Sequence, residues 1–203
     1  MKKITRLLGL GLLIFLLFGG NAVWAQSVAP STSLLDQDAI QQIREWLKNP
    51  VVEMSIKAQN ERYVSLPQEQ VDNLDKQWRA ERKSEDQPLI AATLSSPLSS
   101  YLIQIQAASG GLFTEIFVMD AKGLNVGQSA ITSDFWQGDE AKFQKTFPNG
   151  VDAVFIDEPE FHEDSKTWRT QVNLTVSGSD QEKIGAVTVE YNLTELARRR
   201  GLL

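Results

Sequence analysis

The strongest constraint on the fold of this chain is the alternation of residue types in segment 167–177. Its odd positions are all polar and its even positions are mostly apolar: Arg169, Gln171, Asn173, Thr175 and Ser177 against Trp168, Thr170, Val172, Leu174 and Val176. Successive side chains of a β-strand point to opposite faces of its sheet. The segment therefore predicts a strand with one face on a core and the other facing water or a polar ligand.

The remainder of the second half of the chain supplies partners for this strand. Turn residues separate the runs 112–119, 124–129, 151–157 and 184–191, which have the composition of strands. A short helix is expected at 139–147 and a basic helix or tail at 194–200. Glu115 lies between Phe113 and Phe117 and is expected at an exposed strand edge.

The first half of the chain has helical periodicity instead. Apolar residues recur at helical spacing in 34–48, 51–64 and 67–78, and prolines punctuate these stretches. Ser96 and Pro97 predict the start of another helix. We expect a helical region over 34–96, which is either one long helix interrupted by prolines or several helices. Helices followed by an antiparallel meander predict an α+β fold.

The N-terminal segment has the order of a secretory signal peptide. Lys2, Lys3 and Arg6 precede an apolar run at 7–18, and the small residue Ala25 follows. That run has about 12 residues, whereas a membrane-spanning helix needs about 20. We expect 1–25 to be a signal peptide cleaved after Ala25, 26–33 to be a flexible leader, and the protein to be periplasmic. The alternative is that the segment is retained as a membrane anchor.

Charge and composition exclude several classes of function. Loss of the three cations in 1–25 would change the formal net charge from −6 to −9, and such an acidic protein repels nucleic acid. The absence of cysteine excludes disulfides, thiolate metal sites and a cysteine nucleophile. His162 is the only histidine, and no Gly-x-Ser-x-Gly motif accompanies it. We therefore expect no enzymatic activity, no catalytic residue, no metal site and no cofactor.

The chain resembles the Cache domains, which are extracellular PAS-like sensor modules of bacteria. The resemblance rests on segments 116–123, 133–140, 154–156, 171–174 and 184–189. It implies a single sensor domain over 97–203, completed by a long N-terminal helix that packs on a central antiparallel sheet. It also implies that a small ligand binds on the other side of that sheet, under the loops and short helices between the central strands.

Two groups of residues are candidates for a ligand site. Asp134 and Trp136 place a carboxylate beside an aromatic surface, as a small-molecule pocket requires. Lys142, with the backbone N–H groups at the start of the 139–147 helix, could bind an anionic group. The alternative for the Asp134–Trp136 segment is a purely structural loop.

Three further candidates depend on which surface the ligand occupies. Gln171 and Asn173 would supply neutral hydrogen bonds if the polar face of 167–177 lines the pocket. If that face meets water, they are ordinary surface residues. The Tyr101 hydroxyl could reach a ligand, although Tyr101 falls on an apolar helical stripe and fits a core position equally well.

Together these features favour a stand-alone periplasmic sensor. It would bind a small polar or anionic metabolite and signal through a separate membrane-bound protein. The alternative is a ligand-free interaction module that regulates a membrane receptor or enzyme by docking. A homodimer formed through the N-terminal helix is a further alternative, because the apolar stripe of that helix is explained equally well by pairing with a second copy and by packing on its own sheet.

Overall fold

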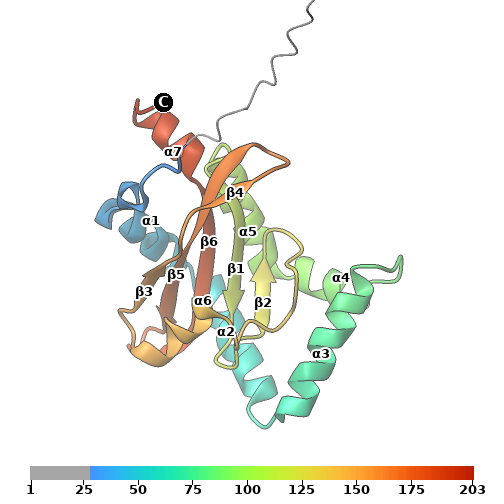
Figure 1. Cartoon of the computed structure of the whole chain (residues 1–203). Coiled ribbons are helices and arrows are strands. Elements are labelled where there is room, and N and C mark those ends of the chain that lie inside the picture. Colours follow the sequence, from blue (N-terminus) through green and yellow to red (C-terminus); the bar gives the residue numbers. More distant parts are fainter. Residues whose placement is uncertain (1–27) are drawn as a thin grey trace, which may run out of the picture.

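The protein, seen here as a computed structural model, is described over residues 28–203. The predicted signal peptide 1–25 and its cleavage site lie outside the described residues. Helices come first and are followed by an antiparallel sheet, which confirms the α+β class (Figure 1). The helices are α1 (Gln37–Leu47), α2 (Pro50–Tyr63), α3 (Gln68–Glu81), α4 (Pro88–Leu94), α5 (Pro97–Ala108), α6 (Ala141–Gln144) and α7 (Leu193–Arg199).

The sheet has the strand order β2-β1-β6-β5-β3, and β4 also pairs with β5. All of its pairings are antiparallel. The strands are β1 (Phe113–Met119), β2 (Asn125–Gln128), β3 (Val154–Ile156), β4 (Glu160–His162), β5 (Thr167–Ser177) and β6 (Lys183–Asn192). The central pair is β5 with β6, whose register runs from Arg169 opposite Asn192 to Ser177 opposite Lys183.

Because of the alternation in β5, the two faces of the sheet pack against different parts of the chain. Val172, Leu174 and Val176 are buried with apolar residues of α1, α2 and α5 in the main core. On the opposite face, Phe143 of α6 packs with β-strand residues, including Phe117, in a smaller cluster. Each face of the sheet is therefore covered, and the polar side of β5 lies beneath α6 and the segments around it.

The long helix implied by the resemblance is present as α1 and α2, with a break between them. Helix α1 ends at Leu47 with Lys48 as its C-cap, and Asn49 caps α2, where its side chain accepts a hydrogen bond from the Val51 N–H at 3.0 Å. Pro50 then occupies the first turn of α2, where its missing N–H costs no helical hydrogen bond. The two helices therefore start and stop at residues suited to those positions.

Two parts of the second half differ from the sequence-based expectation. The helix expected at 139–147 forms only over Ala141–Gln144 and is followed by a 3₁₀ turn at Phe147–Asn149. Pro148 has no N–H and so cannot continue the α-helical hydrogen bonds of α6, whereas it is tolerated in the first turn of the 3₁₀ helix. Strand β4 was not predicted, because its three residues are too few to show a period. Phe161 of β4 contacts Trp168 of β5 edge-to-face, with ring centroids 5.3 Å apart.

Helices α3 and α4 form a hairpin, called the arm below, that projects from the β2 side of the sheet (Figure 1). The arm shares a small core with residues on either side of β2, and this core comprises Val71, Trp78, Ile90, Leu124 and Phe135. Trp78 stacks on Phe135 at 5.3 Å and donates a hydrogen bond to the Thr132 carbonyl at 3.0 Å. The arm is therefore attached to the loop 132–137 through buried contacts.

The turn between the two arm helices depends on Glu81, which is 6% exposed. Its Oε2 accepts hydrogen bonds from the N–H groups of Leu89 (2.8 Å) and Ile90 (3.0 Å). These groups belong to the first turn of α4, whose N-cap residue makes no side-chain cap. Glu81 therefore satisfies donors that would otherwise be buried without a partner.

Among residues 28–203, none of the helices has both the length and the apolar character needed to cross a membrane.

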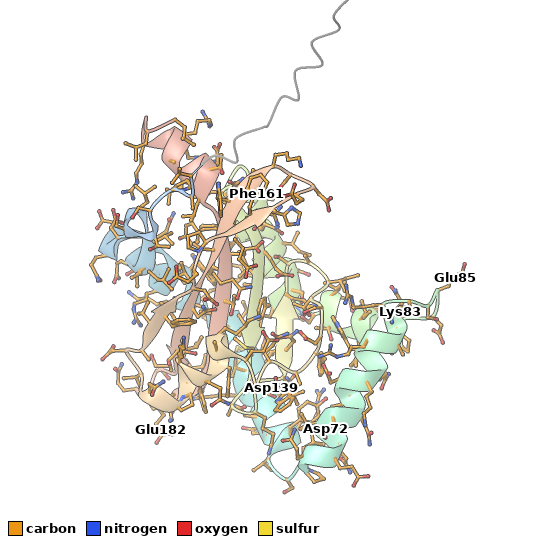
Figure 2. The ribbon with its side chains drawn as sticks, in the orientation of Figure 1. Asp72, Lys83, Glu85, Asp139, Phe161 and Glu182 are labelled. Atoms are coloured by element: carbon orange, nitrogen blue, oxygen red, sulfur yellow. The ribbon has the colours of Figure 1, made fainter. Side chains whose placement is uncertain are left out.

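Replacing Glu81 by Met keeps the length of the side chain and removes the acceptor. We expect the variant to lose about 1–3 kcal/mol of unfolding free energy, because two N–H groups at the start of α4 lose their partner. Urea denaturation measures the loss. The matched control is Glu85→Met at the exposed far end of the arm (Figure 2), which should change stability by less than about 0.5 kcal/mol. Equal losses in the two variants would contradict the capping role.

Candidate ligand-binding site

A cavity of about 260 Å³ lies over the polar side of β5, where α6 and the connection between β3 and β4 meet the sheet. Its walls come from separate parts of the chain: Glu140 and Lys142; Asp157, Glu158 and Glu160; Arg169, Thr170 and Gln171; and Glu190. Ligand pockets commonly have volumes of about 300–1,000 Å³. This cavity is slightly smaller than that range and therefore has room only for a small metabolite.

Lys142 is the cation on the α6 side of this cavity. Its side chain is 13% exposed and its Nζ lies 2.9 Å from Glu140 Oε2. The same Nζ donates a hydrogen bond to Gln137 Oε1 at 3.3 Å and lies 5.4 Å from the centre of the Phe117 ring. Because little water reaches this ammonium, its interactions with other charges in the cavity are weakly screened.

Arg169 is the cation on the sheet side. Its Nη1 lies 3.1 Å from Glu190 Oε2, and both side chains are about one-fifth exposed. The Thr114 hydroxyl donates a short hydrogen bond to the same carboxylate oxygen. Glu190 is opposite Gln171 in the β5–β6 register, so Arg169 reaches it diagonally across the two strands. The pairing fixes both charged groups at the cavity wall.

Glu115 lies on β1 directly opposite Glu190 of β6. Burial and the neighbouring Glu190 charge raise the pKa of Glu115 to about 7, and Lys142 and Arg169 oppose that shift. Asp134 adds a weaker upward contribution to the same pKa. The expected exposed edge position is therefore wrong, because β2 flanks β1 on its other side and Glu115 is partly buried.

The structure places Gln171 and Asn173 on the same side of the sheet but in different surroundings. Gln171 lines the cavity. Asn173 is fully buried, donates to the Phe155 carbonyl at 3.1 Å, and accepts from the Thr188 hydroxyl at 2.7 Å. The Asn173 amide is thus already used to hold β3, β5 and β6 together.

Asp134, Trp136 and Tyr101 do not line this cavity. Asp134 is bound by Arg79 and Gln137, at 2.9 and 2.7 Å. Trp136 donates to the Lys122 carbonyl at 2.8 Å and packs against the small core of the arm. The Tyr101 hydroxyl donates to the Trp46 carbonyl at 2.8 Å, which joins α5 to α1 on the helical side of the sheet. The six predicted residues are therefore not assembled into one site.

Of the charged residues that line the cavity, the prediction included only Lys142. It missed six: Arg169, Glu190, Glu140, Asp157, Glu158 and Glu160. Arg169 lies on the polar face of the same alternating strand as Gln171, so the parity argument could have included it. Glu190 is an acid within the apolar run of the last strand, and Glu115 lies between two aromatic residues of β1. A charged residue inside a strand of apolar residues was the available signal.

A second cavity, of about 350 Å³, lies between α1, the start of α2 and the turn from β5 to β6. Its charged groups pair mainly along the surface, where Lys48 binds Glu45 at 2.8 Å and Glu53 binds Lys57 at 2.8 Å. None of the predicted ligand residues lines it. Over residues 28–203, no group of three or more acidic or histidine side chains has the geometry of a metal site.

The raised pKa of Glu115 predicts a pH-dependent effect of the Glu115→Gln substitution. The folded protein holds this proton more tightly than the unfolded chain, so the carboxyl destabilises the fold as pH rises from about 4.5 through 7. We expect Glu115→Gln to be nearly neutral at pH 5 and to add on the order of 2–3 kcal/mol at pH 8.5. Urea denaturation at the two pH values tests this.

The control for that measurement is Glu182→Gln, whose side chain is exposed at the far end of the sheet (Figure 2). It should leave the difference between the two pH values unchanged. An equal effect of Glu115→Gln at pH 5 and pH 8.5 would show that burial does not hold a proton on Glu115.

No family model matches the chain, and no curated protein matches it. Solved structures that resemble it are sensory domains of bacterial receptors and kinases. The sensory domain of the Campylobacter jejuni chemoreceptor Tlp3 has a TM-score of 0.39 at 10% identity, covering 80% of this chain and 58% of that one. The ligand-binding domain of the Pseudomonas aeruginosa amino acid chemoreceptor PctC, in complex with GABA, has a TM-score of 0.41 at 13% identity, covering 79% of this chain and 62% of that one.

The sensor domain of DcuS from E. coli has a TM-score of 0.39 at 19% identity, covering 64% of this chain and 96% of that one. The chain spans about three-fifths of the length of the chemoreceptor domains. These neighbours are of the kind that the resemblance to Cache sensor domains predicted. All three TM-scores are below 0.5, and all three identities are below 20%.

Proposed function

We propose that this protein is a sensory protein that binds a small polar metabolite in the cavity over β5. The observation that supports the proposal is the cavity itself, which is built by α6, β5, β6 and the β3–β4 connection. It contains fixed charges and the neutral amide of Gln171. A small pocket with a few convergent polar groups is the usual form of a metabolite-binding site.

The charges of the cavity bear on the nature of the ligand. Five acids line it, namely Glu140, Asp157, Glu158, Glu160 and Glu190, with two cations. Both cations already have carboxylate partners, Lys142 in Glu140 and Arg169 in Glu190. An anionic ligand group would have to displace one of these carboxylates, whereas a neutral or amino group would not. The cavity therefore fits a polar ligand more readily than a purely anionic one.

Signalling through a separate membrane-bound protein is the second part of the proposal. It follows from the resemblance of segments such as 116–123 to extracellular sensor modules and from the expected export of the chain. The competing function is a ligand-free interaction module, in which the cavity stays unoccupied and docking alone regulates the partner. Ligand binding by the isolated protein distinguishes the two.

The decisive experiment compares three four-carbon compounds that differ in their terminal charges: succinate, 4-aminobutanoate and 1,4-diaminobutane, within a wider metabolite panel. A ligand that binds the native state raises the melting temperature. At about one hundred times its Kd a ligand adds about 2.7 kcal/mol, which is several degrees for a domain of this size. We expect at least one panel member to produce such a shift.

Gln171→Leu should weaken that shift by removing a hydrogen-bonding group from the cavity wall without changing its charge. The loss of one such contact corresponds to about a tenfold weaker Kd. Gln70→Leu, on an exposed position of α3, is the control and should respond as the original protein does. A panel in which no compound shifts the melting temperature would instead favour the interaction module.

A further inference from the structure

A buried glutamine at the end of the loop 132–137, to which the arm is attached, connects this loop to the cavity. Gln137 is 1% exposed. Its Nε2 donates to Asp134 Oδ1 at 2.7 Å and to the Asp134 carbonyl at 3.1 Å, and its Oε1 accepts from Lys142 Nζ at 3.3 Å. Both ends of one amide are therefore occupied, one by the cavity cation and the other by the loop.

The loop is bound in turn by α3 of the arm. Arg79 Nη2 lies 2.9 Å from Asp134 Oδ2, and Arg79 Nε lies 2.7 Å from Asp75 Oδ2. Asp75 Oδ1 accepts hydrogen bonds from the N–H groups of Phe135 (2.9 Å) and Trp136 (3.1 Å). The chain of contacts thus runs without a gap from Lys142 through Gln137 and Asp134 to Arg79 on the arm.

We propose that Gln137 and Asp134 are positioning residues that hold Lys142 at the cavity and couple its orientation to the arm. The arm is then the element through which occupancy of the cavity changes the outer surface of the protein. This last step rests on the proposed function. The coupling between Lys142 and Arg79 is a property of the protein alone and is testable without a ligand.

The burial of the central residues gives the coupling its strength. Gln137 and Asp134 are both buried, at 1% and 8% exposure, so a broken contact there leaves a polar group without water to replace its partner. The Arg79 side chain is 54% exposed and would contribute little as an isolated surface pair. Its effect comes from fixing a buried carboxylate. A change at either end therefore alters the arrangement at the other, and the linkage is reciprocal.

The first test reads the state of Lys142 after a change on the arm. The NMR signal of the Lys142 ammonium group, assigned by its loss in Lys142→Arg, is measured in the full chain. Arg79→Met should shift that signal. In a protein that already carries Gln137→Met, the addition of Arg79→Met should shift it no further. Arg82→Met is the matched control. Arg82 is the C-cap residue of α3 and binds the same loop at the Ser133 carbonyl (2.9 Å), outside the chain of contacts.

The second test runs in the opposite direction. Lys142→Met should increase hydrogen exchange in the arm, residues 68–94, whereas Lys145→Met should not, because Lys145 lies over the Phe155 ring at 4.0 Å. An unmoved Lys142 signal in Arg79→Met, or equal shifts in Arg79→Met and Arg82→Met, overturns the coupling. Unchanged arm exchange in Lys142→Met does so as well. None of these outcomes tests the proposed function, which is tested separately by the metabolite panel.

Discussion

The pairing of β5 with β6 is the interaction on which the remaining structure depends. Its register sends Val172, Leu174 and Val176 toward the helices, and a shift by one residue would place the polar set in the main core. The same register aligns Gln171 with Glu190 and brings Arg169 within reach of that acid. One ladder of hydrogen bonds therefore fixes both the core and the charged wall of the cavity.

The second face of the sheet carries buried polar side chains beside the small apolar cluster of Phe117 and Phe143. Asn173 and Thr188 bind each other there with no exposure to solvent, and Glu115 and Glu190 lie opposite each other on adjacent strands. Like charges in that position destabilise a sheet. The shift of the Glu115 pKa, the Arg169 contact and the nearby Lys142 are three ways in which this repulsion is reduced.

The sequence sufficed for elements whose signal is periodic or whose ends carry distinctive residues. The limits of β5 are those expected from its alternation, and α5 begins at Pro97 with Ser96 as its cap. It did not suffice for β4, which has no period to detect. Nor could it separate Asp134 from Lys142 as site residues, because only the folded loop shows that Asp134 is occupied by Arg79 and Gln137.

The apolar cluster that holds the arm is much smaller than the main core that packs against the sheet. Regions with few buried apolar contacts open at lower free energy than the global fold. If Arg79 and Asp75 release the loop in such an opening, Lys142 loses its orientation while β5 and β6 stay paired. Affinity for a ligand that needs Lys142 would then decline on warming well before the protein unfolds, so the cavity would respond to temperature as well as to metabolite concentration.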